Sequence, residues 1–154
     1  MRIAAMKTKP IVVLVDGSDE SAAALAWAVG RVAGTGEPLR VVTDYEQPFP
    51  ATDVAGEFWR ELIVAKRAAR ERAEGVLVDV LGHTDVDHIL RLGAIERVLV
   101  DMSSEASLIV VGHRRSTTWW SRRRGSLADR IKDAAACPVV SVPLGDVLDE
   151  PIAA

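Results

Sequence analysis

The residues best suited to chemistry lie between positions 110 and 131, in the stretch VVGHRRSTTWWSRRRGSLADRI. Gly112 ends an apolar run, and Gly125 comes directly before Ser126, where a helix is expected to begin. The free N–H groups and positive dipole end of such a helix suit an anion, and the Ser126 hydroxyl can face the backbone or a phosphate. Glycines and serines at these places are also common turn residues. Local features therefore leave a phosphate cradle and an ordinary loop both open.

Basic and aromatic residues fill the space between these two glycines: Arg114, Arg115, Trp119, Trp120, Arg122, Arg123 and Arg124. Arginine binds phosphate, and tryptophan stacks on bases or anchors protein interfaces. Nucleic-acid binding is therefore a hypothesis for this patch, although the net charge of -3 disfavours a general polyanion binder. We expect nucleic acid to be the least favoured partner and at least one tryptophan to pack beneath the loop.

Other polar candidates follow the remaining apolar runs: Asp16, Gly17, Ser18, Thr43 and Asp44. Asp16 is either an acceptor that faces a ligand or an Asx-turn residue that caps the next helix. His113 is expected to be a solvated loop residue. No cluster of cysteine, histidine and carboxylate ligands suggests a metal site, and no nucleophile has a base partner, so no catalytic residue is assigned.

Composition indicates one globular domain in a reducing compartment. A chain of 154 residues can bury a sound core, and the single cysteine, Cys137, excludes an internal disulfide framework. No apolar run approaches the roughly 18 residues that a membrane span needs. We expect a cytoplasmic protein without membrane contact, with a flexible leader over residues 1–9, a domain over 10–144 and an acidic tail over 145–154.

Strand and helix patterns alternate along the chain. Apolar runs predict buried strands, and a period of two at 86–92 predicts a strand with one less protected face, giving strands at 11–15, 39–43, 86–92, 107–112 and 138–142. Helical spacing predicts helices at 20–34, from about 55 to 80, at 95–102 and at 126–136. The outer face of the second helix is expected to be a solvated surface of Arg, Lys and Glu. This order predicts an α/β fold with a parallel sheet and helices on both faces, and ligands beyond the carboxyl ends of the strands.

Three segments together resemble the universal stress protein family: IVVLVDGSDESAAALAWAV, LRVVTDYEQP and ASLIVVGHRR…GSLADRI…ACPVVSVP. The resemblance covers residues 11–143. It implies a single-domain open parallel five-stranded sheet of the adenine nucleotide alpha hydrolase-like type, with strand order 3-2-1-4-5. It also implies a regulatory or stress-response module.

ATP-binding members of this family carry G-x2-G-x9-G-[ST] after the fourth strand. Gly112, Gly125 and Ser126 match this pattern, whereas the second glycine position is Arg115. By resemblance, ATP, with Mg as its companion, would contact Asp16, Gly17, Ser18, Asp44, Gly112, Arg115, Gly125, Ser126 and Leu127. Arg115 either prevents the close backbone approach that glycine allows or holds a phosphate through its guanidinium.

The alternative by resemblance is a stress protein that binds no nucleotide and acts by dimerisation and protein interaction, because GHRRSTTWWS resembles the family's non-ATP-binding branch. In this family the final strand commonly pairs with its dimer mate. The apolar strand that begins at Val139 and ends at Val142 fits this role as a sheet edge, which implies a homodimer. A regulatory protein partner is implied without an identity, and any enzymatic activity would be at most weak ATP hydrolysis.

Overall fold

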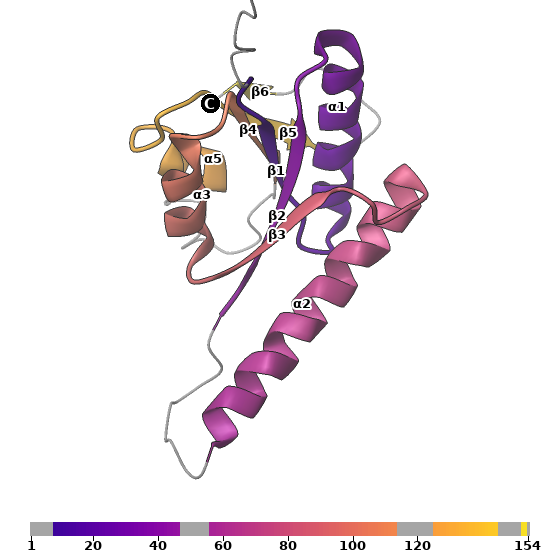
Figure 1. Ribbon diagram of the computed structural model, residues 1–154. Helices are drawn as coiled ribbons and strands as arrows, with labels where there is room; N and C mark the ends of the chain where they lie inside the picture. Colours follow the sequence, from indigo (N-terminus) through magenta and orange to yellow (C-terminus); the bar gives the residue numbers. More distant parts are fainter. Residues whose placement is uncertain (1–7, 47–55, 114–124, 145–151, 154) are drawn as a thin grey trace, which may run out of the picture.

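The computed structural model describes residues 8–46, 56–113, 125–144 and 152–153 (Figure 1). Strands and helices alternate along these residues, as the sequence predicts. Their bounds are β1 (Ile11–Leu14), α1 (Asp19–Thr35), β2 (Leu39–Tyr45), α2 (Glu57–Leu81), β3 (Asp87–Leu92), α3 (Ile95–Ser103), β4 (Leu108–His113), α5 (Leu127–Ile131), β5 (Val139–Pro143) and β6 (Ile152–Ala153). No helix in the described part of the chain is long and apolar enough to cross a membrane.

The strands form one sheet in the order β3-β2-β1-β4-β5-β6, and β1 to β5 are parallel. The predicted order 3-2-1-4-5 is therefore confirmed. Val13 of β1 lies opposite Val41 of β2 on one side and Val110 of β4 on the other. The chain changes direction across the sheet between β1 and β4, which is where open α/β sheets bind their ligands.

Helices cover both faces of the sheet, as predicted (Figure 1). Alternate residues of β1 point to opposite faces, so Val13 packs with Leu25 of α1 and Leu77 of α2. Its neighbour Val12 packs in the second core cluster, with Leu99 of α3 and the α5 helix. α1 and α2 thus form one outer layer, and α3 and α5 form the other.

The sixth strand changes one expectation. β6 pairs antiparallel with β5, placing Ala153 opposite Val140 and Ile152 opposite Ser141. The expectation that β5 is the edge of the sheet is therefore wrong for this structure, because β6 covers part of its free side. Pairing of this kind satisfies backbone groups that an edge strand leaves open. Homodimerisation through β5 stays a prediction, and it would require β6 to move aside.

The fourth predicted helix is shorter than expected, because α5 ends at Ile131 instead of Ala136. The N–H groups of Ala134 and Ala135 both bond to the Ile131 carbonyl, so the regular helical pattern stops there. The Ala136 N–H then donates to the hydroxyl of Ser103 in α3 at 2.8 Å. This hydrogen bond holds the segment that leads into β5 against α3.

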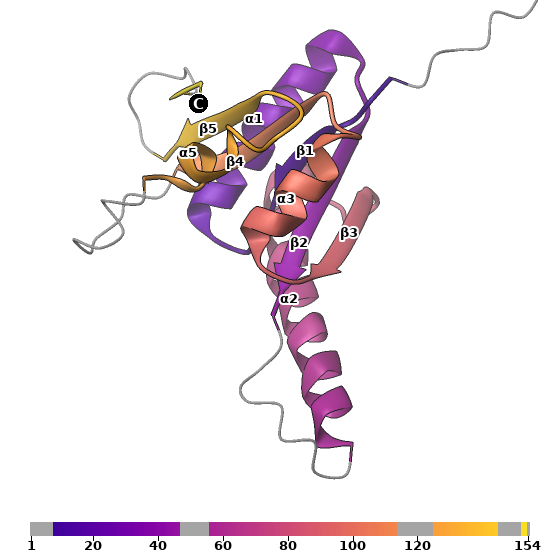
Figure 2. The same ribbon diagram turned by 90° about the vertical axis from the view of Figure 1, so that its left-hand side faces the viewer.

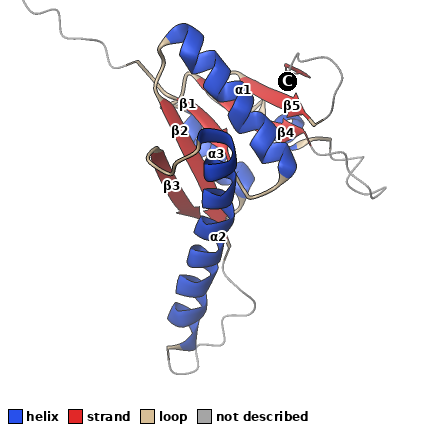
Figure 3. Ribbon diagram, turned by 90° about the vertical axis from the view of Figure 1, so that its right-hand side faces the viewer, coloured by secondary structure: helices blue, strands red, loops and turns tan. Residues whose placement is uncertain are grey.

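The longest helix, α2, is buried only in its second half. Its buried residues are Ala69, Ala73, Val76 and Leu77. Figures 2 and 3 show the first half extending past the sheet. The apolar residues of this helix begin at Phe58, but the sheet is too short to cover all of them.

Candidate functional site

The turn after β1 is built around Asp16. Its Oδ1 accepts hydrogen bonds from the backbone N–H of Ser18, at 2.9 Å, and from the Ser18 hydroxyl. Ser18 is the N-cap of α1, since its hydroxyl oxygen accepts from the Ser21 N–H at 3.2 Å. The structure therefore forms the Asx-type turn that the sequence left as one of two alternatives. A ligand contact by Asp16 stays a prediction.

Gly17 lies in this turn with a φ of +93° and touches α2. A Cβ at this position would lie 2.7 Å from the Cβ of Arg72. Both the positive φ and the close approach therefore demand glycine. The contact also places Arg72, a residue that the sequence did not single out, beside the carboxyl end of β1.

Asp44 lies inside β2, which continues to Tyr45, and not after the strand as predicted. Burial raises the pKa of its carboxyl group, and the charges of Asp16 and Glu46 raise it further, while Arg72 opposes them. The parallel register of β1 and β2 and the contact of Gly17 with Arg72 place Asp16, Asp44 and Arg72 at one end of the sheet. The structure thus gathers two candidates from separate strands with a cation from α2.

The pKa of Asp44 makes stability depend on pH. The folded protein binds this proton more tightly than the unfolded chain, whose Asp pKa is about 3.9. Stability therefore falls as pH rises from the unfolded toward the folded pKa. We expect Asp44→Asn to raise the midpoint of thermal unfolding at pH 7, and the gain to vanish below about pH 3.5. Identical midpoints for the two proteins at pH 7 would contradict this.

Thr43 connects β2 with the end of β1 and with the amino end of β3. It is 1% exposed, and its hydroxyl donates to the Val15 carbonyl at 2.7 Å. The same oxygen lies 2.8 Å from Nε2 of His88 in β3. Because the hydroxyl proton is used on Val15, His88 is the donor in that second bond. Burial lowers the pKa of His88, with smaller contributions from nearby charges. The spacing of these residues in the sequence carried no signal for this chain of contacts.

Gly112 and His113 end β4, and His113 differs from its predicted setting. A Cβ on Gly112 would lie 2.5 Å from the backbone carbonyl of Glu20, in the first turn of α1. Gly112 is therefore required for helix packing, a role that the sequence did not predict. His113 is partly buried in the strand instead of solvated in a loop, and its Nδ1 lies 3.2 Å from the Ser141 hydroxyl of β5.

Ser126 is the N-cap of α5 in a capping box. Its hydroxyl oxygen accepts from the Asp129 N–H at 3.2 Å, while Asp129 Oδ2 accepts from the Ser126 N–H at 3.0 Å and from its hydroxyl at 2.9 Å. These hydrogen bonds hold the pKa of Asp129 below its usual value. A phosphate at this helix start would have to displace the Asp129 carboxylate. Gly125, with a φ of +74°, and Leu127, the first residue of α5, flank the cap.

The central part of the loop between Gly112 and Gly125 lies outside the described residues. Arg115, Trp119 and Trp120 fall there, together with the other arginines at 114 and 122–124. Whether Arg115 prevents or assists phosphate binding therefore stays a prediction.

A model of the universal stress protein family matches residues 7–143. The match includes every strand from β1 to β5 and both glycines of the candidate loop. The chain belongs to the universal stress protein family. The resemblance noted in the sequence is thus confirmed.

Two relatives illustrate the place of this domain in the family. A universal stress protein of Mycobacterium tuberculosis is 32% identical over 136 residues, covering 85% of this chain and 47% of its own length. A universal stress protein of Thermus aquaticus is 32% identical over 139 residues, covering 87% of this chain and 98% of its own. The chain thus spans about half the length of the mycobacterial relatives and nearly all of the Thermus one.

Among solved structures, a universal stress protein crystallised in complex with cAMP is 26% identical to this chain. It has a TM-score of 0.58 and covers 89% of this chain and 98% of that one. The universal stress protein fold, with its sheet and helical layers, therefore extends over almost the whole of this chain.

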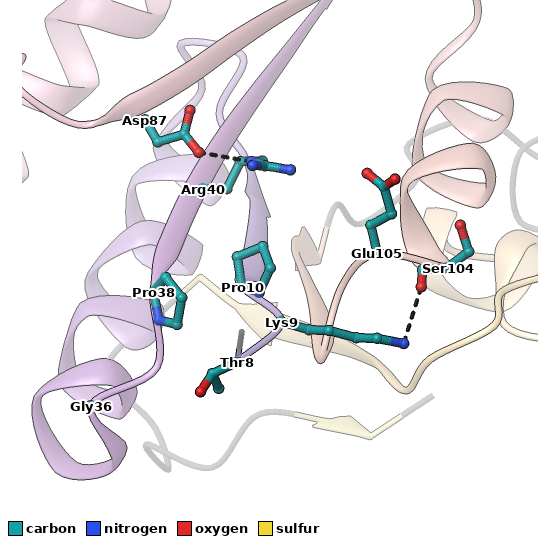
Figure 4. A pocket seen from close by; sticks show the side chains of 9 residues that line it. All are labelled: Thr8, Lys9, Pro10, Gly36, Pro38, Arg40, Asp87, Ser104 and Glu105. Atoms are coloured by element: carbon teal, nitrogen blue, oxygen red, sulfur yellow. Dashed lines mark hydrogen bonds and ion pairs between the residues drawn. The ribbon is translucent and has the colours of Figure 1, made fainter. Parts of the chain in front are cut away.

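This chain also has a pocket of about 720 Å³ at the amino ends of the parallel strands (Figure 4). On its wall, Lys9 Nζ donates to the Ser104 carbonyl at 3.1 Å, and Arg40 Nε lies 2.8 Å from Asp87 Oδ2. Ligands of open α/β sheets bind at the carboxyl ends. The pocket is thus at the opposite end of the sheet from Asp16 and Asp44.

Proposed function

We propose that this chain is a cytoplasmic regulatory or stress-response module that binds an adenine nucleotide at the carboxyl ends of β1 and β4. The observation that supports this most is the convergence of Asp16 and Asp44 at the carboxyl ends of β1 and β2, beside the point where the strand order reverses. A family member with the same fold, 26% identical, has been crystallised with cAMP, which supports an adenine nucleotide as the ligand class.

In this proposal the backbone around Asp44 meets adenine, and the Asp16 carboxylate accepts from a ribose hydroxyl. The phosphates lie toward Gly125, Ser126 and Leu127, with Mg beside a triphosphate. ATP is the proposed nucleotide, and Arg115 is a further contact. Binding a phosphate at Ser126 requires Asp129 to release the cap, so the proposal includes a local rearrangement of the capping box. Homodimerisation through β5 is part of the same proposal.

The test is thermal unfolding of the full chain with and without Mg-ATP, AMP and cAMP. A ligand that binds only the folded state stabilises it by about 2.7 kcal/mol at 100-fold excess over Kd, which is roughly 5–10 °C for a domain of this size. We expect such a shift in the wild type and its loss in Gly125→Arg, whose Cβ alone would stand 3.0 Å from the Asp129 Cβ. Absence of any shift at millimolar concentrations of all three nucleotides would refute nucleotide binding.

Gly82→Arg is the matched control for that variant. Gly82 also has a positive φ, +78°, and an added Cβ there meets nothing within 4 Å. It follows α2 and precedes β3, at the amino end of the strands. The control variant therefore carries the same backbone strain and the same added charge away from the site, and it should keep the nucleotide-dependent shift. If both variants lost the nucleotide-dependent shift equally, the loss would reflect a general effect on folding and not a ligand contact at Gly125.

A further inference from the structure

The first half of α2 exposes large apolar side chains. Trp59 is 64% exposed, Ile63 60% and Val64 65%. Figures 1 and 2 show this half of the helix beyond the end of the sheet, with no other labelled helix or strand beside it. The described fold therefore leaves this surface without a covering element.

Such a surface is unusual for a helix that faces only water. Residues 62–65 read Leu-Ile-Val-Ala, so this turn of the helix is apolar on all sides, a pattern typical of buried helices. The Trp59 ring packs edge-on against Phe58 with 5.2 Å between ring centroids, which restrains the indole. Contiguous exposed apolar side chains of this kind mark interaction sites.

The charged residues on this stripe are basic from Arg60 to Arg70, and the first acidic residue on it is Glu74, one turn beyond Arg70. Trp59 and Ile63, four residues apart, share one stripe of the helix, and Arg60, Lys66, Arg67 and Arg70 lie along it by helical spacing. Within the described residues, Arg60, Arg67 and Arg70 form no salt bridge, while Lys66 lies over the Tyr45 ring at 5.9 Å. The acidic neighbours Glu57 and Glu61 are each two residues from Trp59 and so fall on the opposite side of the helix.

A basic rim around an apolar stripe favours a partner of opposite charge. A second copy that presented the same stripe would bring arginine against arginine, which costs free energy. Tryptophan and arginine are also the residues most enriched in the energetic centres of protein interfaces. Charge complementarity thus selects an acidic amphipathic partner over self-association.

We propose that this stripe, defined by Trp59, Ile63, Arg67 and Arg70, docks an acidic amphipathic helix of another protein. The apolar side of that helix covers Trp59 and Ile63, and its flanking carboxylates pair with Arg67 and Arg70. This role is independent of the nucleotide site at the carboxyl ends of the strands.

The probe is a fluorescently labelled peptide of about 18 residues, long enough to form a helix, with leucine on one face and glutamate elsewhere. A scrambled peptide of the same composition, which lacks the apolar face, is the control. We expect anisotropy titrations of the full chain to give micromolar affinity for the first peptide only, weakening as salt is added. Trp59→Ser should weaken binding by roughly tenfold or more, and Arg67→Gln by several-fold.

Val78→Ser is the matched control variant. Val78 lies on the same helix, is 51% exposed and is outside the stripe, so its loss should leave peptide binding unchanged. Equal binding of both peptides, or unchanged binding by Trp59→Ser, would overturn the proposal. Self-association that Trp59→Ser abolishes in sedimentation would instead identify a second copy as the occupant. Trp59-dependent binding to phosphatidylglycerol vesicles without peptide binding would identify a membrane.

Discussion

Replacing Gly112 with alanine is expected to lower the free energy of unfolding by about 1–3 kcal/mol, the usual effect of forcing an extra methyl group into a packed interior. The added Cβ would stand 2.5 Å from the backbone of Glu20, a distance that real Cβ contacts do not reach. Because the opposing atoms are backbone, no side-chain rotation relieves the clash, and α1 must shift away from β4. Urea denaturation followed by circular dichroism measures the loss.

Gly75→Ala is the control for this experiment. Gly75 lies within α2, and an added Cβ meets nothing within 4 Å. Alanine is the better helix former, so this variant should be more stable than the wild type by up to about 1 kcal/mol. If Gly112→Ala unfolded at the same urea concentration as the wild type, the packing explanation for Gly112 would be wrong.

This expectation affects how the glycine motif is interpreted. Packing against α1 is enough to require glycine at position 112, whether or not a nucleotide is bound. The match at Gly112 alone therefore does not indicate ligand binding. The test of the site rests on Gly125 and its neighbours, where a Cβ would meet only the Asp129 side chain.

The second large effect is expected at Thr43. Thr43→Val keeps the shape of the side chain but removes the hydroxyl that bonds the Val15 carbonyl and His88. Buried polar groups left without partners cost about 1–3 kcal/mol, so the variant should lose about that much free energy of unfolding. Because Thr43 lies beside Asp44 and bonds the residue before Asp16, the change should also weaken nucleotide binding.

Thr43→Ser separates the hydroxyl from the methyl group. Serine retains both hydrogen bonds, so this variant should stay closer to the wild type than Thr43→Val in urea denaturation. The reverse order of stability would show that the methyl packing, and not the hydrogen bonds, matters at this position.

The sheet order and its two helical layers were predictable because each depends on patterns repeated over many residues. β1 is apolar at every position and β4 at its first four, as strands covered on both faces must be. The spacing of Leu25 and its neighbours set the inner face of α1. The end of α5 was not predictable from periodicity, since the residues after it bond to the distant hydroxyl of Ser103. β6 was missed because two residues carry no periodic pattern.

The candidate site likewise combines residues that the sequence predicts with contacts that appear only in the fold. Local order and spacing were enough to indicate the family, the alternation of elements and the candidates Asp16, Asp44, Gly125 and Ser126. The contact of Gly112 with α1, the bonds of Thr43 to Val15 and His88, and the position of Trp59 beyond the sheet became visible in the folded molecule. Each of these depends on contacts, or their absence, between segments far apart in the chain. Periodicity indicates which face of a helix is apolar, but whether that face is covered depends on where the sheet ends.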